Sequence, residues 1–162
     1  MPRKSEKKVI DNINIENAQL RFRNFAGRGS EYNAEGDRNF AVLLDEDLAE
    51  QLLQDGWNVK RLKPREDDEN PEGTPYLTVK VRFEPYPPII QMITSSGKTR
   101  IDQNSAWQLD DSIIREADIV IRPYNYPAIG GRPGGVSAYL KAAYITIEED
   151  AFAAKYSNIP ER

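Results

Sequence analysis

The stretch YLTVKVRF (residues 76–83) alternates between apolar and polar side chains over its whole length. Alternate positions of an extended chain share a face. One face would therefore carry Leu77, Val79, Val81 and Phe83, and the other Tyr76, Thr78, Lys80 and Arg82. This pattern predicts a half-buried β-strand, with the first set on a hydrophobic core and the second set toward solvent.

Similar patterns predict a mainly β fold around this strand. Further strands are expected at residues 15–25, 38–44, 57–62, 89–94, 118–126 and 136–147. Two helices are expected, one over residues 45–56, with Asp45 as N-cap and Gly56 as its end, and one over residues 104–117. Because the helices do not alternate regularly with the strands, the pattern favours a small antiparallel barrel, in which closure removes exposed strand edges.

The chain of 162 residues fits one domain, flanked by two short segments. Residues 1–12 are polar and basic and are expected to form a disordered arm. Residues 13–150 form the expected domain, and residues 151–162 a C-terminal tail. The beginning of the chain lacks the apolar segment of a secretory signal, and no apolar run reaches the length of a membrane span, so we expect a cytoplasmic protein.

The composition excludes several kinds of catalytic site. The chain contains no Cys and no His, which removes thiol nucleophiles, Ser-His-Asp triads and thiolate or imidazole zinc sites. Carboxylates could still hold Mg²⁺, but they cluster locally along the chain, at residues 45–47, 66–69 and 148–150. A rigid two-metal site normally draws its ligands from separate elements. We therefore expect no enzyme activity, no metal and no cofactor.

The segment ITSSGKTR (residues 93–100) contains the Gly-Lys-Thr that ends a nucleotide-binding P-loop. A P-loop needs another glycine five positions before this one, and that position is Met92. The residues after Lys98 also lack the 3.6-residue period of a helix. The segment is better interpreted as a turn that presents Lys98 and Arg100 to solvent, where they could contact the phosphates of a polymer.

The net charge of −4 is unevenly distributed. Residues 45–75 carry ten acidic and four basic side chains, whereas residues 76–147 carry eight basic and six acidic ones. A polyanion responds to the local field of one face. The overall negative charge therefore does not exclude a nucleic-acid partner.

Cations and aromatic rings recur on the outward faces of four predicted strands. They are Arg21, Arg23 and Phe25; Tyr76, Lys80 and Arg82; Arg122, Tyr124 and Tyr126; and Tyr139 and Lys141. Two glycine-containing loops add Arg28 and Arg132, and the turn adds Lys98 and Arg100. Rings that stack on bases, with cations on the backbone, suit single-stranded nucleic acid of any sequence. Neither predicted helix is basic, so the pattern does not favour reading of a duplex groove. For each position alone, an ordinary solvated strand or loop residue is the alternative.

The chain resembles the OB-fold single-stranded-DNA-binding proteins of tailed bacteriophages. The resemblance covers most of residues 13–150 and rests on the segment from AQLRFRNF (residues 18–25) to residue 60, on YLTVKVRF, and on VIRPYNYPAIGGRPGGVSAYLKAAYITI (residues 120–147). It implies an OB-fold domain that coats single-stranded DNA during phage replication and recombination inside the host. Single-stranded DNA is the implied partner, and phage replication or recombination proteins are further candidates.

The C-terminal sequence departs from that of many single-strand binders, and a second function is also considered. Many relatives end in an acidic tail with a terminal aromatic residue that recruits other enzymes, whereas this chain ends KYSNIPER (residues 155–162). The alternative function is a phage-encoded inhibitor of a host defence protein that acts on nucleic acid. Its acidic segment from Glu66 to Glu72 would then mimic nucleic acid.

Overall fold

A computed structural model describes residues 10–64, 71–149, 151–156 and 159. Most of the expected N-terminal arm lies outside these residues. The strands are β1 Ile13–Ile15, β2 Leu20–Asn24, β3 Arg38–Leu43, β4 Val59–Arg61, β5 Pro75–Val81, β6 Ile89–Thr94, β7 Gly97–Ile101, β8 Ile114–Tyr126 and β9 Gly135–Ile147. The helices are α1 Glu46–Gln54, α2 Gln108–Asp111 and α3 Ala151–Tyr156.

The strands form one nine-stranded sheet in which β9 is the central element. The main order is β1-β8-β9-β5-β3-β2, with β4 beside β5 and the β6–β7 hairpin beside β9. β5 and β6 follow each other along the same edge of β9 and pair with it in parallel, whereas the other pairs are antiparallel. The mainly β fold with short helices is confirmed. The sheet is mixed, and its end strands β1 and β2 do not pair with each other in the described chain.

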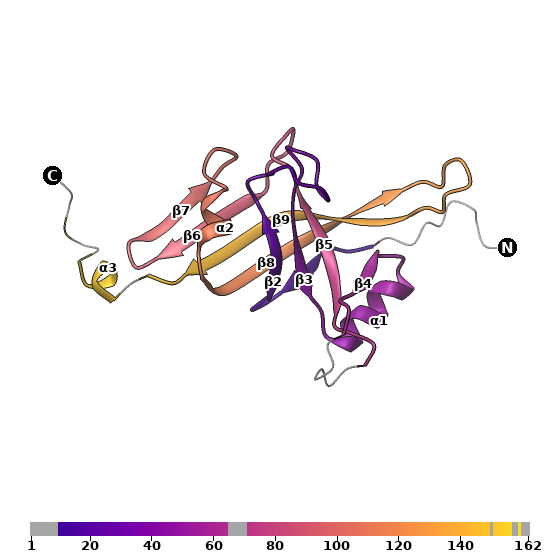
Figure 1. The fold of residues 1–162 in the computed structure, drawn as a ribbon, viewed down its shortest axis with the longest axis horizontal. Helices are drawn as coiled ribbons and strands as arrows, with labels where there is room; N and C mark the ends of the chain where they lie inside the picture. The colour runs from indigo at the N-terminus through magenta and orange to yellow at the C-terminus, as the bar shows by residue number, and fades with distance from the viewer. Residues whose placement is uncertain (1–9, 65–70, 150, 157–158, 160–162) are drawn as a thin grey trace.

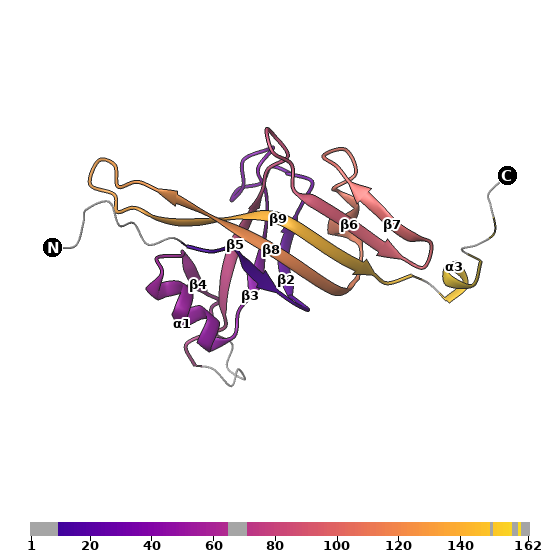
Figure 2. The same ribbon diagram turned by 180° about the vertical axis from the view of Figure 1, so that it is seen from behind.

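The core lies between the inner faces of the curled sheet. Figure 1 shows β2 and β3 crossing in front of the β8–β9 hairpin, and Figure 2 shows the hairpin in front from the other side. Alternate side chains of each strand point into the space between them. Among them, Phe40, Val42, Val79, Ile119 and Ile145 are at most 2% exposed. The strict alternation predicted for β5 is confirmed, since Leu77, Val79 and Val81 are buried.

Helix α1 forms where its capping residues predict it. The Asp45 side chain accepts a hydrogen bond from the Leu48 backbone N–H at 2.7 Å, which satisfies one of the free donors of the first turn. Leu52 is buried, and Gly56 ends the segment with a φ of +92°, which glycine adopts without steric cost. The helix lies beside β4, below the long β8–β9 hairpin in the view of Figure 1.

The second expected helix, over residues 104–117, is wrong for most of its length. Only Gln108–Asp111 are helical, and β8 begins at Ile114. Ile113 is 66% exposed instead of facing the core. Two successive β-branched residues favour an extended chain, and from Ile114 onward this segment pairs with the C-terminal half of β9.

The β8–β9 hairpin is longer than the rest of the sheet and extends beyond it (Figures 1 and 2). Its tip is closed by backbone hydrogen bonds between Ile129 and Arg132 at 2.9 and 3.1 Å. The expected basic turn is the end of a second hairpin, in which β7 pairs with β6. None of the described helices has the length and apolar character needed to cross a membrane.

Candidate nucleic-acid interface

Five of the predicted binding residues converge on one patch of the sheet. Lys80 on β5 and Arg122 on β8 are the direct cross-strand partners of Tyr139 on β9, from opposite sides. Tyr124 lies two positions further along the same face of β8, and Arg82 directly follows the last residue of β5. We call Lys80, Arg82, Arg122, Tyr124 and Tyr139 the Tyr139 cluster. It brings together segments that are far apart in the sequence.

The ring of Tyr139 is the centre of this cluster. Its centroid lies 4.8 Å from the Arg122 guanidinium carbon, 5.6 Å from that of Arg82 and 5.8 Å from Lys80 Nζ. These distances are within the range of cation–π attraction. The ring of Tyr124, which is 50% exposed, meets Tyr139 edge to face with 6.0 Å between centroids.

The three cations of the cluster form no ion pair with a carboxylate of the described residues. The three positive charges repel one another at this separation, and cation–π attraction to the ring offsets only part of the repulsion energy. A phosphate group would neutralise the charges and accept their hydrogen bonds. The cluster therefore has the charge and the hydrogen-bond donors that suit an anion beside an aromatic surface.

A cleft of about 500 Å³ adjoins the cluster. It is lined by Gly36–Asn39, Lys80–Glu84, Gln103 and Tyr139. In this cleft Arg38 lies over the ring of Phe83 at 5.1 Å, which forms a second cation–aromatic pair. Asp37 and Glu84 add carboxylates to the cleft wall.

Sequence reasoning missed the pair of Arg38 and Phe83. Phe83 was assigned to the inner face by alternation, but it lies two residues beyond the end of β5 and is only half-buried. The signal in the sequence was the run EPYPP (residues 84–88), because prolines end a strand. Side chains next to the end of a strand need not follow its alternation between inner and outer face. Arg38 gave no such signal, since it begins a strand whose other residues are mostly apolar.

The turn at Asp102 holds one wall of the cleft. Its carboxylate accepts a hydrogen bond from the Asn104 backbone N–H at 2.8 Å and lies 3.2 Å from the Ser105 hydroxyl. The hydrogen bond from the Asn104 backbone lowers the pKa of Asp102 most, and the hydrogen bond from the Ser105 hydroxyl lowers it further. The ionised side chain thus stabilises the turn that places Gln103 at the cleft.

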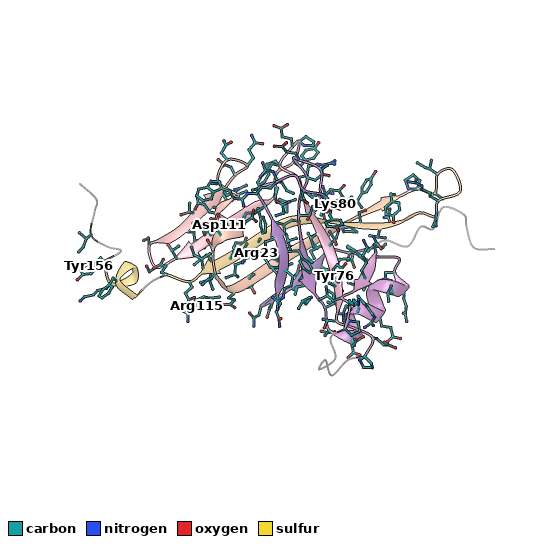
Figure 3. The ribbon with its side chains drawn as sticks, in the orientation of Figure 1. Arg23, Tyr76, Lys80, Asp111, Arg115 and Tyr156 are labelled. Atoms are coloured by element: carbon teal, nitrogen blue, oxygen red, sulfur yellow. The ribbon has the colours of Figure 1, made fainter. Side chains whose placement is uncertain are left out.

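Four further predicted residues lie on strands outside the cluster, three of them on β5, β8 and β9 and one on β2. Lys141 is exposed and lies at a bulge of β9. Its neighbours Leu140 and Ala142 pair with the successive residues Ile121 and Val120 of β8, so Lys141 itself has no partner residue on that strand. Tyr126 is half-buried next to Gly135 in the hairpin. Figure 3 places Tyr76 and Lys80 at different ends of β5. Arg21 is exposed on β2, the far edge of the main sheet.

The prediction that Phe25 faces outward is wrong. Phe25 is fully buried and stacks on Phe40 with 5.1 Å between ring centroids, whereas Phe22 is 67% exposed. The alternation breaks because Phe22 has a φ of +52° and the pairing of β2 with β3 shifts register between Arg21 and Asn24. This exchange of faces removes Phe25 from any binding surface.

Arg23, also predicted to face outward, has a structural role. Its Nη1 donates hydrogen bonds to the carbonyl oxygens of Leu109 and Ser112, at 2.7 and 2.6 Å, at the two ends of α2. The same register shift turns its side chain toward α2. A guanidinium held by two carbonyl oxygens is not free to bind phosphate.

The remaining four predicted residues are not part of the cluster. Arg28 is exposed in the first loop, 3.9 Å from the carboxylate of Asp111. Arg132 lies at the tip of the long hairpin. Lys98 and Arg100 are exposed on β7, which pairs only with β6 in the described sheet.

The acidic segment of the alternative function lies mostly outside the described residues. Of Glu66–Glu72, the structure describes Pro71 and Glu72, and the Glu72 carboxylate lies 3.9 Å from Arg61. The described residues contain no group of three or more acidic side chains placed to hold a metal ion.

The fold has counterparts among solved structures. None of the curated proteins matches the chain. Among solved structures, the single-stranded-DNA-binding protein of bacteriophage Enc34 in complex with ssDNA is similar over 88% of this chain and 89% of its own, with a TM-score of 0.54 and 13% identity. A C-terminal truncation of that protein is similar over 86% and 88%, with a TM-score of 0.52 and 12% identity.

These likenesses confirm the OB-fold type of architecture that the sequence resemblance implied. The family model described as "Putative phage ssDNA-binding domain" matches residues 2–162, which is nearly the whole chain. The chain therefore belongs to the family of phage single-stranded-DNA-binding domains.

Proposed function

We propose that this phage protein binds single-stranded DNA through the Tyr139 cluster and the adjoining cleft. The observation that carries the proposal is the position of three cations around one half-buried tyrosine ring, none of them paired with a carboxylate of the described residues. A base would stack on an exposed part of the aromatic surface, and the flanking phosphates would meet Lys80, Arg82 and Arg122. Stacking contributes roughly 1–3 kcal/mol per base.

Binding of this kind is tolerant of sequence, because every base has a face that can stack. It also favours single strands over duplexes, whose bases are already stacked and paired. The patch lies on β-strands, and the described helices α1 and α2 carry no basic residue that could enter a groove. The Enc34 protein, whose fold is similar, forms a complex with ssDNA, which supports the same ligand class for this chain.

The biological role follows from this binding. We propose that the protein coats and protects single strands in phage DNA replication and recombination, in the cytoplasm of the host. It acts by binding and not by catalysis. Residues 13–150 constitute the binding domain, with a basic arm before it and a tail after it.

Fluorescence anisotropy with labelled oligo-dT tests the proposal. We expect saturable binding at low salt that weakens as salt rises, and much weaker binding of a duplex of equal length. Arg122→Ala and Tyr124→Ala should lower the affinity while the melting temperature stays nearly unchanged. If the wild-type protein gave a flat titration at low salt, the proposed function would be wrong.

A further inference from the structure

The outer face of β8 and β9 carries the Tyr139 cluster at one end and continues from there onto β6 and β7, beyond the proposed DNA site. Figure 2 shows these four strands side by side, with no described helix or strand in front of them. Apolar side chains of this face reach solvent, since Ile89 is 44% exposed and Tyr144 is 41% exposed. Ile93 and Val120 are half-buried beside them.

Cross-strand register arranges the side chains of this face in rows. The first row runs Lys98, Ile93, Thr146, Glu116 and the second runs Arg100, Gln91, Tyr144, Asp118. A third row, Ile89, Ala142 and Val120, is apolar. Paired residues share a face of the sheet. Each of the first two rows therefore begins with a cation on β7 and ends with a carboxylate on β8.

The opposite charges of a row cannot meet within one molecule. Neighbouring strands are about 4.8 Å apart, so the two ends of a row are separated by about 14 Å. Among the described residues, Lys98, Arg100 and Glu116 take part in no ion pair. Arg100 Nη2 makes only a long contact of 3.5 Å with the Pro88 carbonyl oxygen.

We propose that this face binds a second copy of the same chain. A two-fold axis parallel to the strands places β7 of one copy over β8 of the other and keeps the rows in register. Lys98 then meets Glu116 of the partner subunit, and Arg100 meets Asp118 of the partner subunit. The same contacts recur on the other side of the axis, as a two-fold interface requires. The apolar side chains pack at the centre.

The spacing of packed sheets allows these contacts. Sheets that pack face to face lie about 10 Å apart, and an extended lysine and a glutamate together span that distance. The shared face covers four strands of about six residues, which is small for a stable dimer. We therefore expect a weak dimer that depends on concentration and on salt, and that is favoured where a DNA strand holds two copies close together.

The same observations argue against DNA as the occupant of this face. A polyanion would be attracted to Lys98 and Arg100, but each row brings it also to a carboxylate. The Tyr139 cluster has no carboxylate among its five residues, and the carboxylates near it, Asp37 and Glu84, line the adjoining cleft. The proposal is thus independent of the proposed function and concerns a different part of the sheet.

Charge reversal across one row tests the proposal by sedimentation equilibrium at low salt. We expect the wild-type protein to dimerise, and Lys98→Glu and Glu116→Lys each to weaken the dimer about tenfold or more, because each reversal places like charges opposite one another twice. Lys60→Glu, an exposed cation on β4, is the matched control and should leave dimerisation unchanged.

Mixing the two single variants distinguishes a lost interface from a damaged fold. In the mixture, each reversed charge meets an opposite charge, so heterodimers should form with nearly wild-type affinity. The double variant K98E/E116K should recover as a homodimer. A wild-type protein that stays monomeric at all concentrations, or a mixture that stays monomeric, would overturn the proposal. Unchanged dimerisation of K98E with weaker oligo-dT binding would also overturn it and assign the face to DNA.

Discussion

The salt dependence of DNA binding gives the sharpest test of the Tyr139 cluster. Each phosphate that a protein neutralises on a single strand contributes about 0.7 to the slope of log affinity against log salt. Lys80, Arg82 and Arg122 all lie within 5.8 Å of the Tyr139 ring centroid, close enough to serve neighbouring phosphates. Replacing all three by glutamine should therefore lower the magnitude of the slope by about 2.

Fluorescence anisotropy with labelled oligo-dT at several salt concentrations measures this slope. Across a tenfold rise in salt, the triple variant should lose about a hundredfold less affinity than the wild-type protein loses. The control is a second triple variant, with glutamine at Lys60, Lys63 and Arg115, which changes the net charge equally but lies outside the cluster. Equal slopes for the two triple variants would refute the reasoning, because binding would then follow net charge alone.

Three further predictions concern single side chains. Tyr139→Leu should weaken oligo-dT binding by roughly 1–3 kcal/mol in titrations, with the salt slope unchanged, because it removes a stacking surface and no charge; an altered slope would contradict this. Phe25→Ala should lower the free energy of unfolding in urea by about 3–5 kcal/mol, whereas Phe22→Ala should change it by less than about 0.5 kcal/mol; the reverse order would restore the simple alternation of β2. Asp45→Ala should cost about 1 kcal/mol in the same measurement, through loss of the hydrogen bond from Leu48, and no loss would mean that this cap is dispensable.

Strand alternation predicted much of the fold because a periodic pattern is a local property. The strands around residues 76–83 and 136–147 and the helix after Asp45 follow directly from it. The second helix failed because the four-residue spacing of Leu109, Ile113 and Ala117 also arises by chance in a segment that ends as a strand. Pairing with β9, a contact distant in sequence, decides between the two structures.

The candidate site was predictable only where the alternation holds. Lys80, Arg122 and Tyr139 lie on the outward strand faces that the alternation predicts, but their convergence depends on the parallel pairing of β5 with β9, which no local pattern reveals. Arg23 and Phe25 were misplaced because one residue, Phe22, adopts a positive φ and reverses the faces beyond it. A phenylalanine with its backbone in the left-handed region is rare, so the sequence gives no reason to expect one.

A crystal structure of the protein with a short oligo-dT tests the central claim most directly. The account predicts a thymine stacked on the tyrosine surface of the Tyr139 cluster, with adjacent phosphates contacting Arg82 and Arg122. DNA bound on another surface, with the three cations of the cluster left in solvent, would contradict it.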